Sequence, residues 1–129
     1  YPGIEDALIA LRSQGHRLFV ATSKPESISV QILEKFDLAK YFEKICGASL
    51  DRSRVNKEAV IAYLLEENGT ADNMVMVGDT KFDVVGAKSH DIPCIGVSWG
   101  YGLVEDMVSA GAASIAFTMD QLQERLLKD

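Results

Sequence analysis

Hydrophobic residues along the chain alternate between helical and strand-like spacing from one end to the other. The first helical face is made by Ile4, Ala7, Leu8 and Leu11, which follow the i, i+3, i+4, i+7 spacing. Gly15 then stands where a left-handed residue would end such a helix. The chain is therefore predicted to begin with an amphipathic helix that buries this face.

Short apolar runs predict five strands, at residues 18–22, 45–47, 74–77, 94–97 and 114–117. The run at 74–77 is unbroken and bounded by turn residues, which is typical of a strand buried on both faces. Helical patterns separate the runs, including one at residues 82–89. Because strands that alternate with helices form βαβ units, we predict an α/β fold, a Rossmann-like parallel sheet with helices on both faces.

Two further helices have recognisable starts. Pro25 suits the first turn of a helix, and Asn56 can cap another. The helix after Pro25 is predicted to bury Ile28, Ile32, Leu33 and Phe36. The helix after Asn56 is predicted to bury Val60, Ile61, Leu64 and Leu65, and to stop at Gly69.

Size and composition describe one ordinary globular domain, since 47% of the 129 residues are apolar and 25% are charged. Residues 1–129 contain no linker-like stretch and are interpreted as a single segment. No apolar run approaches the roughly 20 residues that cross a bilayer, so we expect no membrane association. Cys46 and Cys94 stand alone without a CxxC pairing, which favours a reduced, cytoplasmic setting.

The chain is acidic, with 13 Lys and Arg against 19 Asp and Glu and a net charge of −6. The basic residues are scattered, so nucleic acid is not expected as a partner. An anionic substrate would need a local cation. In parallel sheets ligands bind beyond the carboxyl ends of the strands, which directs attention to residues 22–23, 78–80 and 98–100.

Asp79 and Asp83 are predicted to lie one turn apart at the start of a helix that follows the 74–77 strand. One interpretation is a site for a hard cation such as Mg²⁺, which would offset the repulsion between the carboxylates. The other is that Asp79 or Thr80 caps the helix and Asp83 interacts with its positive end. The two interpretations are compatible, and the spacing alone does not separate them.

Three other features have a structural and a functional interpretation. Thr22 and Ser23 either cap the next helix or bind a phosphate at its N-terminus. Lys57, in a first helical turn, is either a solvated side chain or a functional cation. Residues 96–102 (Gly-Val-Ser-Trp-Gly-Tyr-Gly) either pack Trp99 and Tyr101 over the sheet edge or let the backbone approach a ligand closely.

Taken in order, these segments resemble the motifs of one enzyme family. Residues 20–25 (Val-Ala-Thr-Ser-Lys-Pro), Lys57 and residues 77–87 (Val-Gly-Asp-Thr-Lys-Phe-Asp-Val-Val-Gly-Ala) resemble the second, third and fourth motifs of the haloacid dehalogenase superfamily of phosphohydrolases. Residues 96–102 resemble a loop of its phosphoglycolate phosphatase-like branch. The resemblance covers nearly the whole chain.

This resemblance implies a Mg²⁺-dependent phosphatase that acts on a small phosphorylated metabolite through an aspartyl-phosphate intermediate. Thr22 would hydrogen-bond the phosphoryl oxygens, with the backbone N–H of Ser23 nearby. Lys57 would neutralise the phosphate and steady the nucleophile. Asp79 would coordinate Mg²⁺, and Asp83 would orient metal-bound water or Lys57 without touching the metal itself. Phosphoryl transfer depends on positioned positive charge, which fits these assignments.

The chain also departs from the family pattern. The family's first motif, a strand ending in Asp-x-Asp that carries the nucleophile, is absent, and Asp51 and Asp72 stand in the wrong contexts. The cap domain of this branch is absent too. We therefore expect residues 1–129 to be a core segment of a longer protein, lacking a strand between 18–22 and 74–77 and inactive alone.

Two alternatives stay open. The first is a non-catalytic α/β module that binds phosphate or a partner and has no nucleophile. The second is a receiver-like signalling domain, although its acidic residues would be expected near the first strands, whereas Asp79 and Asp83 come late in the chain.

Overall fold

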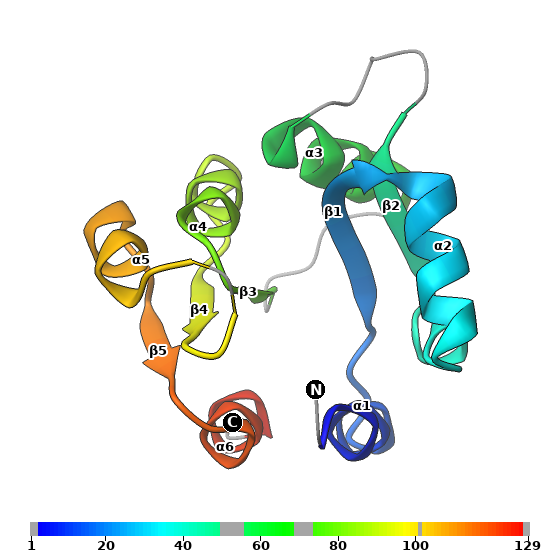
Figure 1. The fold of residues 1–129 in the computed structure, drawn as a ribbon, viewed down its shortest axis with the longest axis horizontal. Helices are drawn as coiled ribbons and strands as arrows, with labels where there is room; N and C mark the ends of the chain where they lie inside the picture. The colour runs from blue at the N-terminus through cyan, green and yellow to red at the C-terminus, as the bar shows by residue number, and fades with distance from the viewer. Residues whose placement is uncertain (1–2, 50–55, 69–73, 101, 128–129) are drawn as a thin grey trace. The chain divides into compact units, whose positions relative to one another are not determined.

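A computed structural model of the chain describes residues 3–49, 56–68, 74–100 and 102–127 (Figure 1). It contains two compact units, residues 1–68 and residues 69–129. Each unit has its own parallel sheet. The expectation that residues 1–129 form a single core segment stays a prediction.

The first unit pairs two parallel strands. Its elements, in chain order, are α1 (Ile4–Ser13), β1 (Phe19–Pro25), α2 (Glu26–Lys35), the 3₁₀ turn η1 (Ala39–Tyr41), β2 (Lys44–Ala48) and α3 (Lys57–Asn68). Phe19 lies opposite Lys44 in the β1–β2 ladder, and Ala21 opposite Cys46. The helices α2 and α3 both pack on this sheet.

The second unit is a three-stranded parallel sheet in the order β3-β4-β5. Its elements are β3 (Met76–Gly78), α4 (Lys81–Lys88), β4 (Cys94–Val97), α5 (Val104–Ala110), β5 (Ser114–Ala116) and α6 (Met119–Leu127). The central strand β4 is buried throughout. Part of the core is a cluster of Ile95, Val97, Ala116 and Leu122, against which Trp99 packs.

The predicted fold class is confirmed, because parallel sheets alternate with helices along the chain. Among the described residues β1 pairs with β2 and β3 pairs with β4, so residues 18–22 and 74–77 lie in different sheets. The prediction that residues 74–77 are buried on both faces is wrong. Val75 and Val77 are 47% and 39% exposed, because β3 has a strand partner on one side only within its sheet.

Two helices bury most of the faces that their spacing predicts, and in α3 Val60 and Ile61 are buried while Leu64 and Leu65 are half-buried. Ala7, Leu8 and Leu11 of α1 are buried, and Gly15 follows the helix with φ of 90°, the left-handed conformation expected of it. Asn56 caps α3, since its side-chain oxygen accepts a hydrogen bond from the N–H of Ala59 at 2.9 Å. The predicted stop at Gly69 lies outside the described residues.

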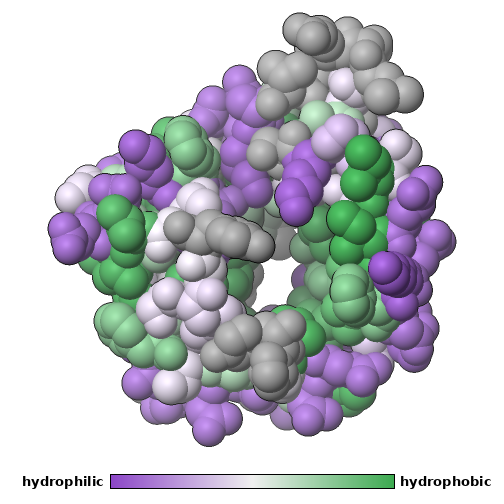
Figure 2. All heavy atoms as spheres, in the orientation of Figure 1, coloured by the Kyte–Doolittle hydropathy of each residue, from purple (hydrophilic) through white to green (hydrophobic). Residues whose placement is uncertain are grey.

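The predicted inner face of α2 is wrong for three of its four residues, and the fourth, Leu33, is half-buried. Ile28, Ile32 and Phe36 are exposed, and hydrophobic side chains reach the surface beside α2 in the space-filling view (Figure 2). The buried residue of this helix is Ser29, whose hydroxyl donates to the carbonyl of Pro25 at 3.1 Å. A small polar side chain therefore occupies the inner position that the hydrophobic pattern gave to large apolar ones.

Gly47 explains how closely α2 approaches the sheet. A Cβ at this position would lie 2.7 Å from the Cα of Glu26 and 2.7 Å from the carbonyl oxygen of Lys24. Both are backbone atoms at the junction of β1 and α2. The start of α2 thus rests directly on the backbone of β2, which brings the narrow Ser29 face of the helix toward the strands.

In the part of the chain that the structure describes, no helix has both the length and the apolar character required for a membrane span. Cys46 and Cys94 are both buried thiols.

Gly47→Ala is predicted to lower the free energy of unfolding by about 1–3 kcal/mol, because the added methyl group meets backbone that cannot move away cheaply. The measurement is chemical denaturation followed by circular dichroism. Ala62→Ser, on the exposed face of α3, adds one atom without a clash and should change stability by less than about 0.5 kcal/mol. Equal losses for the two variants would contradict the proposed close approach.

Candidate functional site

The carboxyl end of β1 departs from regular strand geometry at the predicted phosphate-binding residues. The register with β2 shifts between Ala21 and Pro25, so residues 22–24 interrupt the ladder. The hydroxyl oxygen of Thr22 accepts a hydrogen bond from the N–H of Lys24 at 3.1 Å. The Thr22 hydroxyl thus forms a local turn and does not cap α2. The N-cap of that helix is Pro25, which makes no side-chain cap bond. The side chain of Ser23 lies outside the described residues.

Lys57 is held at this same strand end. It is the first residue of α3, and its ammonium group donates to the carbonyl oxygen of Ala21 at 2.9 Å. Ala21 directly precedes Thr22, so the cation and the Thr22 hydroxyl belong to one local arrangement within the first unit. Lys57 is also only partly exposed, which does not fit a merely solvated side chain.

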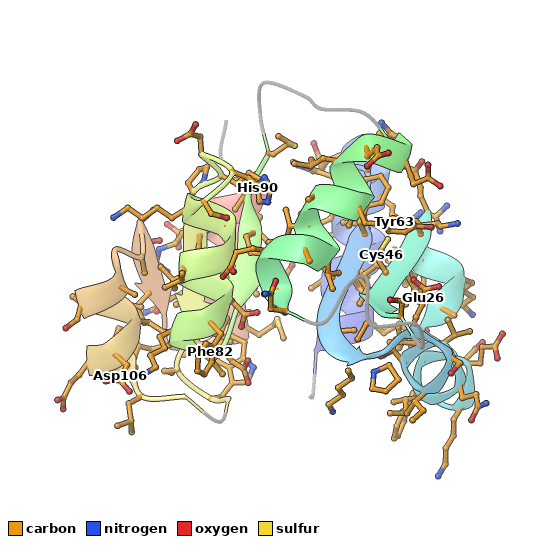
Figure 3. All side chains as sticks on the ribbon, turned by 90° about the horizontal axis from the view of Figure 1, so that it is seen from above. Glu26, Cys46, Tyr63, Phe82, His90 and Asp106 are labelled. Carbon is orange, nitrogen blue, oxygen red and sulfur yellow. The ribbon has the colours of Figure 1, made fainter. Side chains whose placement is uncertain are left out.

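Glu26 is a polar contact at this end of the sheet that the sequence did not reveal. Its carboxylate accepts a hydrogen bond from the N–H of Gly47 at 3.1 Å and so ties β2 to the first turn of α2. Figure 3 shows Glu26 at the start of α2, near Cys46 of β2. The only sign of this contact in the sequence was an acidic residue directly after Pro25. Acidic residues are common in the first turn of any helix, so the position alone did not reveal the contact.

Asp83, in the second unit, is buried and accepts three hydrogen bonds on one carboxylate oxygen. The donors are the N–H of Asp79 at 3.0 Å, the N–H of Thr80 at 3.2 Å and the hydroxyl of Thr80 at 3.3 Å. Thr80 is the N-cap of α4. The capping interpretation of this segment is therefore confirmed for Thr80 and Asp83.

Asp79 occupies the turn between β3 and α4, at the carboxyl end of the second sheet. Its backbone N–H is bound by Asp83 and its own side chain is partly exposed. A carboxylate here is a chemically suitable ligand for Mg²⁺, which prefers oxygen donors and keeps several waters. Within the described residues no group of three His, Cys, Asp or Glu side chains is arranged to hold a metal ion. Asp79 thus fits the role of one ligand of a magnesium site, and the described residues do not supply a complete set of ligands.

The structure therefore brings the predicted residues together in two pairs, Thr22 with Lys57 in the first unit and Asp79 with Asp83 in the second. Of the two predicted aromatics, Trp99 packs on the core cluster, as the structural interpretation expected, whereas Tyr101 lies outside the described residues. Each pair stands at the carboxyl end of a parallel strand, where ligands bind in such sheets.

A hollow of about 480 Å³ lies at the other end of the first sheet and is lined in part by Arg12, His16 and Lys40. Its charges are largely paired. Arg17 lies 2.8 Å from Glu43 and lowers the pKa of that carboxyl group by hydrogen bonding, and Lys40 lies 2.9 Å from Asp37. We therefore do not assign this hollow as the phosphate site.

The chain is similar to known proteins in both sequence and structure. The family described as haloacid dehalogenase-like hydrolase matches residues 1–97. The chain belongs to this family. A solved structure of a predicted phosphatase from Clostridium acetobutylicum has a TM-score of 0.96 and 45% identity, covering 100% of this chain and 60% of that one.

The curated relatives differ in the activities that their names give. The tyrosine-protein kinase PtkA of Mycobacterium tuberculosis is 42% identical over 98% of this chain and 44% of its own length. The phosphoglycolate phosphatase of Agrobacterium fabrum is 35% identical over 78% of this chain and 44% of its own length. The chain thus spans less than half the length of both relatives, and its likeness to the phosphoglycolate phosphatase branch is confirmed.

Asp83→Ala is predicted to lower the free energy of unfolding by about 1–3 kcal/mol, because the N–H groups of Asp79 and Thr80 lose their acceptor. Asp83→Asn should lose less, since an amide oxygen still accepts hydrogen bonds without the charge. The matched control is Asp106→Ala, an exposed acid in the first turn of α5. Thermal denaturation of all three variants tests the ranking, and a loss at Asp106 as large as at Asp83 would contradict it.

Proposed function

We propose that the protein containing this chain is a Mg²⁺-dependent phosphatase that hydrolyses a small phosphorylated metabolite, of a phosphoglycolate or nucleotide type. The observation that carries the proposal is the Lys57 ammonium group, fixed at the carboxyl end of β1 beside Thr22. A chain of net charge −6 binds an anion only where a cation is positioned, and Lys57 is such a cation at a strand end.

The first unit binds the phosphoryl group in this proposal. The Thr22 hydroxyl donates to a phosphoryl oxygen while its oxygen continues to accept from the N–H of Lys24. The backbone N–H of Ser23 is a second donor. Lys57 neutralises charge that develops on the phosphoryl oxygens and steadies the nucleophile. Donors placed before the reaction need no rearrangement as the charge develops, which is the main source of rate in phosphoryl transfer.

Asp79 and Asp83 take different roles. When bound, Mg²⁺ supplies positive charge that orients and polarises the phosphoryl group, and Asp79 is one of its ligands. The three hydrogen bonds of Asp83 support a role in fixing the backbone at Asp79. In this role Asp83 acts on the metal through Asp79 and through water rather than by direct contact.

The nucleophile is proposed to be an aspartate outside these 129 residues, because no Asp-x-Asp follows any of the strands. Its attack would form an aspartyl phosphate, with departure of the alcohol, and water would then release inorganic phosphate. Substrate selectivity would come from the cap domain that the branch carries. By itself the 129-residue chain is expected to be inactive.

A second candidate function is phosphoryl transfer to a protein hydroxyl, which is favoured by the 42% identity to a relative named as a tyrosine kinase. Both reactions require a positioned phosphoryl group. They differ in its final acceptor, which is water in hydrolysis and a protein hydroxyl in transfer. An assay of the full-length protein with ATP and with an aryl phosphate separates them. Activity toward neither substrate would favour the non-catalytic binding module.

Asp79→Asn in the full-length protein is predicted to reduce Mg²⁺-dependent hydrolysis of an aryl phosphate by about 100-fold or more, because the amide lacks the charge that holds the metal. EDTA should abolish the activity of the native protein and excess Mg²⁺ should restore it. Asp106→Asn, an exposed change in the same unit, is the control. Native turnover by the Asp79 variant would overturn the metal assignment.

Lys57→Met in the full-length protein is predicted to lower kcat about 100-fold and to weaken inhibition by inorganic phosphate, since the ammonium charge is lost while the side-chain length is kept. Lys35→Met, in the last turn of α2, removes an exposed charge and should leave both quantities unchanged. If the two lysine variants behave alike, Lys57 is not the phosphate-binding cation.

A further inference from the structure

The loop that follows β4 approaches Asp79 more closely than any side chain would allow. A Cβ built on Gly100 would lie within 3.0 Å of the Cβ, Cγ and Oδ2 atoms of Asp79. All three atoms belong to the Asp79 side chain, so the Gly100 backbone rests against the side chain and carboxylate of Asp79. A side chain at position 100 would clash with Asp79, so this close approach requires glycine there.

A second glycine of the loop binds the backbone at the same place. The N–H of Gly102 donates to the carbonyl oxygen of Asp79 at 3.0 Å, and a Cβ on Gly102 would lie 2.8 Å from the Cα of Thr80. Because β3 and β4 are adjacent parallel strands, with Gly78 opposite Gly96, their two following loops leave the sheet side by side. The close approach is therefore built into the strand register.

A third glycine, Gly78, lies against the side chain of Asp83, the other member of the acidic pair. A Cβ on Gly78 would lie within 3.0 Å of the Asp83 side chain, which in turn accepts the N–H of Asp79. Asp79 thus has its N–H bound by Asp83, its carbonyl bound by Gly102 and its side chain confined by Gly100. Both backbone polar groups and one face of the side chain are held from two segments, the first turn of α4 and the loop after β4.

We propose that Gly100 and Gly102 are positioning residues that hold the Asp79 carboxylate in its metal-binding orientation. This inference deepens the proposed function and rests on the role of Asp79 given there. A carboxylate on a turn would otherwise sample several rotamers, and a metal would have to select one of them. The glycine loop removes that freedom before the metal binds, and groups that orient metal ligands in this way typically contribute 10–100-fold to metal affinity.

The central experiment is Gly100→Ala in the full-length protein. The added methyl group displaces the Asp79 side chain, so the dissociation constant for Mg²⁺, measured by calorimetry without substrate, should rise about tenfold or more. The apparent kcat at fixed Mg²⁺ should fall, while the KM for an aryl phosphate changes less than about threefold, because Thr22 and Lys57 are untouched. An unchanged Mg²⁺ dissociation constant would overturn the inference.

Gly15→Ala is the matched control. Gly15 has φ of 90° and nothing within 4 Å of a built Cβ, so alanine there strains the backbone without reaching Asp79. The variant should lose some thermal stability but keep the native Mg²⁺ dissociation constant. If Gly15→Ala weakens Mg²⁺ binding as much as Gly100→Ala does, the effect is general destabilisation and the inference fails.

If Gly100→Ala folds poorly, a double variant tests the contact between position 100 and Asp79. Asp79→Gly removes the three atoms nearest to the new methyl group. Gly100→Ala should therefore lower Tm by roughly 5 °C or more in the native background, and by less than half of that beside Asp79→Gly. Recovery of folding by the double variant supports the contact. Equal shifts in the two backgrounds, or failure of both proteins to fold, would overturn it.

Separate results test the metal-binding role of Asp79 and the positioning role of Gly100. If Asp79→Asn binds Mg²⁺ as the native protein does, the proposed function fails whatever Gly100 does. If Asp79→Asn loses Mg²⁺ and Gly100→Ala does not, the proposed function stands and the positioning inference alone is wrong.

Discussion

The buried carboxylate of Asp83 is the interaction on which the arrangement of the second unit depends. A buried carboxylate is costly unless donors compensate it, and here three donors converge on one oxygen from Asp79 and Thr80. Those bonds start α4 and set the direction of the turn after β3. The same bonds fix where Asp79 leaves the strand. One stabilising contact therefore determines both a helix start and the position of a candidate metal ligand.

The first unit follows the same principle with charges of both signs. The ammonium group of Lys57 is bound to the carbonyl of Ala21, and the carboxylate of Glu26 is bound to the N–H of Gly47. In each case a long side chain is held by a backbone group at the carboxyl end of a strand. Because strand backbone is rigid, a charge anchored to it loses less entropy when a ligand arrives than a freely moving side chain would. Both units thus present charge that is already oriented.

Sequence patterns predicted the features that depend on local spacing. The α/β order, the inner face of α1, the cap at Asn56 and the start of α4 follow from periodicity and capping chemistry within a few residues. The prediction for α2 was wrong because the face that turns inward depends on where the helix rests on the sheet, and its first residue, Glu26, lies against Gly47, some twenty residues away. Likewise, the glycines at 100 and 102 were visible, but the partner they approach depends on the register of β3 with β4.

This dependence on register explains why the same glycine-rich segment has two interpretations in a single sequence. A glycine shows that a backbone comes close to something, and only the neighbouring strand identifies what that is. At Gly100 the neighbour is a carboxylate of the same chain rather than a ligand. The close approach of Gly100 is therefore explained within the chain, since its backbone limits the positions available to the Asp79 side chain.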